Sequence, residues 1–82
     1  MHRRVDVLMP DLELGADVVC VSLWLVEVGT AVRVDDRLLE IVADGVTFDV
    51  PSSCAGRLVR KLVGEDDPLR PGDLLGTIEV EE

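Results

Sequence analysis

Few side chains in this 82-residue chain stand in a pattern that supports chemistry. The acidic run at residues 65–67 supplies the carboxylate oxygens that Ca²⁺ prefers, but no spaced ligand loop surrounds it, and we interpret it as a solvated turn. The Ser-Ser-Cys run at residues 52–54 has no histidine near it in any motif, because the single histidine is His2. We therefore expect no catalytic residue, no metal site and no self-contained enzyme.

The two cysteines, Cys20 and Cys54, lack the spacing of metal ligands, and we interpret them as small apolar fillers. A disulfide between them stays open on count alone, although a cytosolic setting disfavours it. We expect a cytoplasmic protein without a membrane partner. The basic start is not followed by an unbroken apolar core, and the longest apolar run, residues 18–28, is too short to span a bilayer.

The charge balance is strongly acidic, with 17 acidic and 8 basic side chains and a formal net charge of −9. Nucleic-acid binding requires a basic face, so the sequence argues against a nucleic-acid partner. Excess charge of one sign keeps a small domain soluble and monomeric, and it suits a basic protein surface as a partner.

The sequence repeats itself once, because residues 21–44 align with residues 58–81 at a constant shift of 37 without a gap. Two copies are too few for a solenoid, and they predict two half-domains related by a pseudo-twofold axis. The openings of the halves, residues 5–9 and 46–50, are each followed by proline and match at a shift of 41. Identical residues are Leu25/Leu62, Val26/Val63, Arg33/Arg70, Asp36/Asp73, Leu38/Leu75 and Ile41/Ile78.

Short apolar runs separated by glycine and proline predict an all-β sandwich or barrel without a helix longer than one turn. Strands are expected near residues 5–9, 18–27, 38–43, 46–50, 57–63 and 75–80, with very short ones near 31–33 and 68–70. The predicted core contains Val21, Leu25, Val32, Leu38, Ile41, Leu58, Leu62, Leu69, Leu75 and Ile78.

Asp44-Gly45 joins the two halves between apolar runs. A type I′ turn requires positive φ at both central positions, which makes Asp-Gly a strong two-residue hairpin signal. We expect a tight, exposed hairpin tip at the midpoint of the chain.

The ordered motifs together resemble the lipoyl domains of the biotinyl/lipoyl carrier family. The resemblance implies a flattened β-barrel of two four-stranded sheets with quasi-twofold symmetry, also called a barrel-sandwich hybrid. It covers residues 1–82 as a single lipoyl-like domain with half-repeats at about 5–44 and 46–82. The matching motifs are MPDL at 9–12, WLVEVG at 24–29 with Val32, Asp35-Asp36, LLEI at 38–41, TFDVPS at 47–52, Ala55-Gly56 and PGDLL at 71–75.

In that family a lysine at the hairpin tip carries lipoate or biotin through an amide. Here the tip reads Asp44, Gly45 and Val46, so the resemblance implies that the attachment lysine is absent and that no cofactor is bound. Glycines anchor this alignment, because Gly29 lies 16 residues before position 45 and Gly56 lies 11 after it. Lys61 is the only lysine, and it falls in a predicted strand.

Two functions follow from this resemblance. The first is a non-catalytic protein-binding or assembly module that docks on the enzyme components that handle lipoyl domains. The alternative is a genuine lipoyl carrier, the swinging-arm domain of a complex of the 2-oxo acid dehydrogenase type, in which Gly45 is an introduced change. A lysine codon at position 45 of the native gene would favour the carrier, and a lipoyl adduct on this chain after exposure to a lipoate ligase would contradict the first function.

Overall fold

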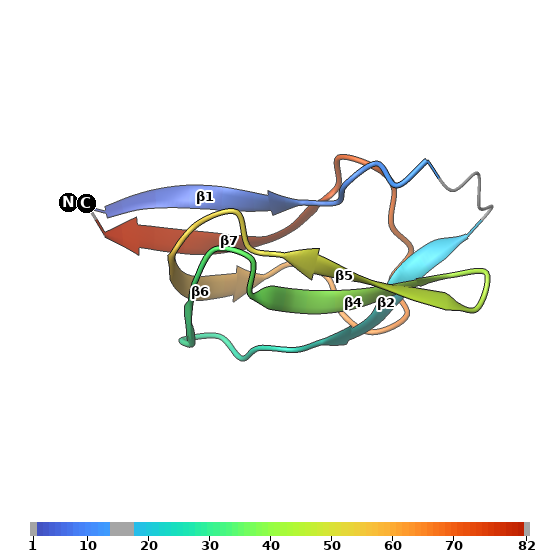
Figure 1. Cartoon of the computed structure of the whole chain (residues 1–82), viewed down its shortest axis with the longest axis horizontal. Coiled ribbons are helices and arrows are strands. Elements are labelled where there is room, and N and C mark those ends of the chain that lie inside the picture. The colour runs from blue at the N-terminus through green and yellow to red at the C-terminus, as the bar shows by residue number, and fades with distance from the viewer. Residues whose placement is uncertain (1, 14–17, 82) are drawn as a thin grey trace.

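Two β-sheets make up the described part of the chain, residues 2–13 and 18–81, in the computed structural model (Figure 1). The first sheet has the strand order β1-β7-β6-β3, and the second has the order β2-β4-β5. All paired strands are antiparallel. The bounds are β1 His2–Leu8, β2 Val19–Trp24, β3 Ala31–Val32, β4 Arg37–Ala43, β5 Val46–Pro51, β6 Gly56–Lys61 and β7 Leu74–Glu81.

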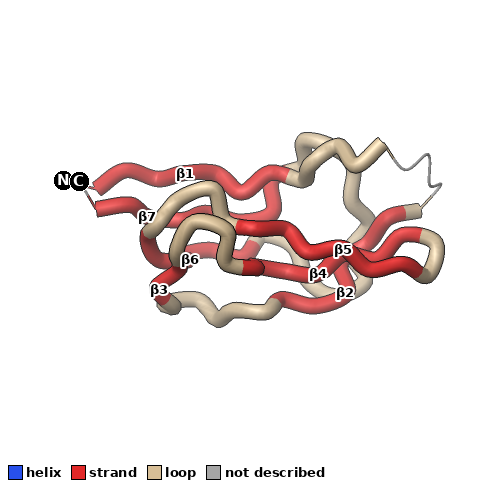
Figure 2. Tube along the Cα trace, in the orientation of Figure 1, coloured by secondary structure: helices blue, strands red, loops and turns tan. Residues whose placement is uncertain are grey.

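Only strands and loops occur among the described residues (Figure 2), which confirms the predicted all-β class. No helix in this part of the chain is long and apolar enough to cross a membrane.

Each sheet combines strands from both halves of the sequence. In the first sheet β1 and β3 come from the first half, whereas β6 and β7 come from the second. In the second sheet β2 and β4 come from the first half and β5 from the second. Three of the five strand pairs among the described residues, β1–β7, β3–β6 and β4–β5, therefore join one half to the other.

The prediction of two four-stranded sheets is wrong for the second sheet, which has three strands. The expected strand near residues 68–70 is an isolated bridge between Pro68 and Cys20. Pro68 stands at the repeat position of Ala31 in β3, and proline has no N–H to donate along a strand. The neighbouring ladder bond is still made, because the N–H of Leu69 donates to the carbonyl of Val19 (2.7 Å).

The internal symmetry extends to individual hydrogen bonds. The N–H of Leu25 donates to the carbonyl of Leu38 (2.8 Å), and 37 residues later the N–H of Leu62 donates to the carbonyl of Leu75 (2.9 Å). This agreement confirms the predicted quasi-twofold symmetry at a shift of 37. Four further pairs of main-chain hydrogen bonds are related by the same shift. Written from the N–H donor to the carbonyl acceptor, they are Thr30 to Glu27 and Asp67 to Gly64; Gly29 to Leu58 and Asp66 to Val21; Leu58 to Thr30 and Val21 to Asp67; Asp36 to Arg33 and Asp73 to Arg70.

The predicted shift of 41 between the opening strands is wrong by two residues. The N–H of Met9 donates to the carbonyl of Asp73, and the N–H of Ser52 donates to that of Asp36, both at 2.8 Å. Since Asp36 and Asp73 are repeat partners, Met9 corresponds to Ser52 at a shift of 43. The prolines that follow the two predicted opening strands, Pro10 and Pro51, suggested the shift of 41. Main-chain pairing, and not the position of a proline, sets the register of a strand.

The core lies between the sheets and contains eight of the ten residues predicted for it: Val21, Val32, Leu38, Ile41, Leu58, Leu69, Leu75 and Ile78. Leu25 and Leu62 were predicted wrongly, since they are 40% and 41% exposed. The β2–β4 register shifts between Val21 and Leu23, and the β6–β7 register shifts at the corresponding place. A bulge adds one residue and moves later side chains to the opposite face of the sheet. The alternation of buried and exposed positions that starts at the buried Val21 therefore does not bury Leu25.

Candidate functional site

The hairpin between β4 and β5 forms the candidate site. Ala43 pairs with Val46, and the two residues between them have positive φ, 50° for Asp44 and 78° for Gly45. This is the type I′ turn that the Asp-Gly dipeptide predicts. Asp44, Gly45 and Val46 are all exposed. A Cβ at Gly45 would meet no atom within 4 Å, so any side chain there would extend into solvent.

The exposed turn is anchored by buried side chains in the two strands that lead to it. Ile41 in β4 is fully buried and pairs with Phe48 in β5, whose side chain packs against the core. Burying a side chain of this size stabilises the fold by roughly 1.5–3 kcal/mol. The hairpin is therefore anchored two residues from its terminal pair, and only its tip is free of packing.

The hairpin tip and the two chain ends lie at opposite ends of the molecule (Figure 1). The long dimension of the molecule is 41 Å, against 20 and 19 Å for the others. A surface that contacts the tip therefore approaches along the long axis.

Lys61 is placed differently from a tip residue. Its ammonium lies 5.3 Å from the centroid of the Trp24 ring and 3.7 Å from a carboxylate oxygen of Glu27. Its side chain is only 23% exposed. The Trp24 indole N–H donates to the carbonyl of Val63 (2.8 Å), which fixes the ring beneath the ammonium. Cation–π contact and the carboxylate together hold the amine against the sheet.

Trp24 and Lys61 also mark the symmetry axis, because they are repeat partners at the shift of 37 and they touch. A residue that contacts its own symmetry mate lies beside the axis. The sequence repeat already paired these two positions, but only the structure shows that they meet.

The other chemically suggestive runs form turns. The N–H of Gly64 donates to the carboxylate of Asp67 (2.8 Å), so the acidic run at 65–67 closes a turn. Ser52 is buried, and its hydroxyl donates to the carbonyl of Cys54 (2.6 Å). Both cysteines are free. Among the described residues, no three side chains of the metal-ligating types gather at one place.

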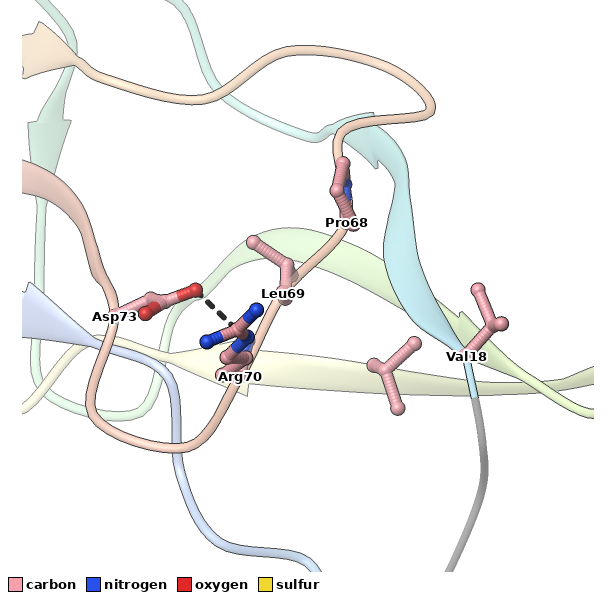
Figure 3. A pocket seen from close by; sticks show the side chains of 6 residues that line it. Val18, Pro68, Leu69, Arg70 and Asp73 are labelled. Carbon is pink, nitrogen blue, oxygen red and sulfur yellow. Dashed lines mark hydrogen bonds between the residues drawn. The ribbon is translucent and has the colours of Figure 1, made fainter.

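An open hollow of about 470 Å³ lies on the same sheet as the hairpin (Figure 3). Val19 in its wall pairs with Ala43 of the hairpin. The carboxylate of Asp73 accepts the main-chain N–H of Arg70 (2.8 Å), which closes the turn that forms one side. Apolar side chains make up the opposite wall. The hollow therefore offers a surface for contact, and its lining contains no nucleophile paired with a general base. The lining residues are Val18, Val19, Pro68, Leu69, Arg70 and Asp73.

The fold and the site define a small symmetric β-sandwich module that presents a rigid hairpin. A family model described as "Biotin-requiring enzyme" (Biotin_lipoyl) matches residues 5–78. The chain therefore belongs to the biotinyl/lipoyl domain family, which confirms the resemblance seen in its motifs.

Similar proteins include acyltransferase components of dehydrogenase complexes. The chain is 38% identical over 73 residues to the dihydrolipoyllysine-residue acetyltransferase component of the pyruvate dehydrogenase complex of Corynebacterium glutamicum, covering 89% of this chain and 11% of that protein. It is 35% identical over 74 residues to the dihydrolipoyllysine-residue succinyltransferase component of the 2-oxoglutarate dehydrogenase complex of Escherichia coli K12, covering 90% and 18%. The chain thus spans less than a fifth of the length of either relative.

A solved structure shares the fold. The lipoyl domain of the 2-oxoglutarate dehydrogenase complex of Azotobacter vinelandii superposes with a TM-score of 0.67 at 23% identity. The match covers 88% of this chain and 94% of that domain. At this identity the likeness establishes the architecture of the two sheets.

Proposed function

We propose that this chain is a lipoyl-type domain that carries no lipoate and acts as a protein-binding or assembly module. The observation that carries this proposal is Gly45 at the second central position of an otherwise complete hairpin. Amide attachment of lipoate requires an amine at the tip, and glycine has no side chain to supply one. Neither Asp44 nor Val46 provides a substitute, since a carboxylate and an isopropyl group are not acylated by a ligase.

The environment of Lys61 supports the same proposal. Its ammonium is paired with Glu27 and lies against the Trp24 ring, and both contacts would be lost on acylation. It also stands in β6, with no turn to present it to an enzyme. The one side-chain amine of the chain is therefore a poor acceptor.

The partners we propose are the enzyme components that handle lipoyl domains. The similar proteins named above are components of multienzyme dehydrogenase complexes, and this chain keeps the family fold with the hairpin exposed at one end. Such a domain would occupy the surface that receives a carrier hairpin without delivering an acyl group. An acidic module suits a basic receiving surface, because complementary charge speeds association and fixes orientation.

The first test is the intact mass of the chain after co-expression with a lipoate ligase in the presence of lipoate. We expect the unmodified mass, whereas a lipoyl domain with a tip lysine, treated in parallel, gains the lipoyl group. A lipoyl adduct on this chain, located by peptide mapping, would contradict the proposal and favour the carrier function.

The second test measures binding. The unmodified chain is added to the reductive acylation of a lipoylated domain by the decarboxylase component of a 2-oxo acid dehydrogenase complex. We expect the apparent KM for the lipoylated domain to rise with kcat unchanged, because the two domains compete for one surface. An unrelated acidic β-domain at equal concentration is the control, and equal rates with both would argue against a binding role.

A further inference from the structure

The hairpin tip contains the only Asp-Gly dipeptide of the sequence, and the chain has no asparagine. In an Asp-Xaa pair, a bond between the aspartate side-chain carboxyl carbon and the main-chain nitrogen of the next residue closes a five-membered ring. A bulky Xaa side chain hinders the closure of that ring, and glycine offers no such hindrance. Gly45 therefore exposes Asp44 to a reaction that other residues at this position would slow.

The geometry leaves both reacting groups free. No hydrogen bond or ion pair engages the Asp44 carboxylate within the described part of the chain. The ladder bonds of a two-residue hairpin run between the flanking residues, here Ala43 and Val46, so the Gly45 nitrogen takes no part in them. Open space surrounds Gly45, and the tip lies beyond the packed base of the hairpin, where local opening is least costly.

We propose that Asp44 is a site of spontaneous isomerisation to isoaspartate. The main-chain nitrogen of Gly45 attacks the side-chain carboxyl carbon of Asp44, a C–N bond forms and a C–O bond breaks. The carboxyl oxygen leaves as water, which takes one proton from the nitrogen and the other from the protonated carboxyl group. Water then hydrolyses the cyclic imide at either of its two carbonyls. One cleavage restores aspartate, and the other leaves the main chain running through the former side chain. No oxidant, reductant or cofactor takes part.

The product changes the tip without changing its charge. Isoaspartate adds one methylene to the main chain between Ala43 and Gly45 and moves the carboxylate onto the α-carbon. A two-residue type I′ turn has no room for an extra main-chain atom, so the pairing of Ala43 with Val46 loosens. The modified hairpin thus differs in shape at its exposed tip. This inference does not depend on the proposed binding role.

Asp49 provides an internal control in the same hairpin. Its carboxylate lies 3.4 Å from the guanidinium of Arg37, and the residue after it is Val50, which is β-branched and buried. Both features oppose ring closure. Trypsin cleaves after Arg37 and Arg57, so one peptide, residues 38–57, reports on Asp44 and Asp49 together.

The experiment incubates the full folded chain in heavy-oxygen water at neutral pH and physiological temperature. Hydrolysis of the imide inserts the heavy isotope at the affected residue, and tandem mass spectrometry of peptide 38–57 locates it. Methyl-group acceptance from a protein isoaspartate methyltransferase measures the isoaspartate itself. We expect both signals to rise with time at Asp44 and to stay at background at Asp49.

Two variants define the chemistry. Asp44→Glu keeps the charge but requires a six-membered ring, so both signals at position 44 should fall to background. Gly45→Lys introduces a side chain that hinders ring closure and should slow the reaction. A synthetic peptide of residues 38–57 shows what the unfolded sequence can do. If that peptide isomerises while the folded chain, verified by its amide spectrum, takes up no isotope at Asp44, the turn protects the site and the proposal is wrong.

Discussion

Single glycines decide two different properties of this molecule. Gly45 has a φ of 78° and open space around it, so a side chain at this position meets conformational strain and no steric clash. Gly76 is the opposite case, because a Cβ there would lie 2.6 Å from the carbonyl oxygen of Arg60 and 3.2 Å from the Trp24 ring. The first glycine governs what the tip can carry, and the second lets β7 pack closely against β6 in the same sheet and against the Trp24 ring.

Gly45→Lys should create an acceptor for lipoate. The hairpin, Asp44 and both flanking strands are already in place, and the new side chain would extend into solvent. Positive φ should cost about 1 kcal/mol of unfolding free energy. The measurement is intact mass after incubation with lipoate ligase, ATP and lipoate, with the unaltered chain as the control. A folded variant that stays unmodified while a lipoyl domain is fully modified would show that a lysine at the tip is not enough to make this chain an acceptor.

Gly76→Ala should destabilise the fold by about 1–3 kcal/mol, because the added methyl group overlaps a main-chain atom in a packed region. Urea unfolding followed by the fluorescence of Trp24, the single tryptophan, gives the free energy. Gly64→Ala is the matched control, since its Cβ would meet only the Asp67 carboxylate at 4.0 Å. Equal midpoints for the two variants would mean that the β6–β7 region adjusts to the methyl group.

At the scale of elements, two turns of the same design sit in equivalent places. The carboxylate of Asp36 accepts the N–H of Arg33 (2.8 Å), and the carboxylate of Asp73 accepts the N–H of Arg70 (2.8 Å). Aspartate stabilises such turns by bonding the main chain nearby. Each turn leads into a long strand, β4 or β7, so each one directs a strand into a different sheet.

Asp36→Ala and Asp73→Ala should each lower the unfolding free energy by about 1 kcal/mol, the usual net value of one hydrogen bond. The losses should be alike because the turns are alike, and they should add in the double variant because the sites share no partner. Urea midpoints of the two single variants and the double variant test this. Asp36→Asn, which keeps a side-chain oxygen acceptor, should retain most of the stability, and a loss as large as that of alanine would contradict the role of the hydrogen bond.

At the scale of the whole molecule, the strands of the two halves are interleaved. β1 of the first half pairs along its length with β7 of the second, and β5 of the second pairs with β4 of the first. Small domains have little apolar surface to spare, so loss of half the strands removes most of the core.

Neither residues 1–44 nor residues 45–82 should fold alone. Residues 1–44 keep only the β2–β4 pairing and residues 45–82 keep only the β6–β7 pairing, and each fragment leaves one apolar face uncovered. Two-dimensional ¹⁵N–¹H spectra of the separate fragments should show narrow amide dispersion, whereas the full chain should show the wide dispersion of β-structure. A well-dispersed spectrum from either fragment would contradict the interleaved design.

The sequence by itself determined the features that depend on local pattern or repetition. The spacing of glycines and prolines predicted the strands, the shift of 37 predicted the symmetry, and Asp44-Gly45 predicted a type I′ turn that the observed φ values confirm. Each of these follows from turn chemistry or periodicity, which act over a few residues and need no partner strand.

Only the tertiary structure decided which faces are covered and which strands pair. Alternation placed Leu25 and Leu62 inside, but bulges in β2 and β6, visible only in the pairing register, turn both outward. The equivalent hydrogen bonds from Met9 to Asp73 and from Ser52 to Asp36 fixed the shift of 43, and contact across the axis brought Lys61 onto Trp24. Register and contact are properties of two segments together, and a single strand's residues do not contain them.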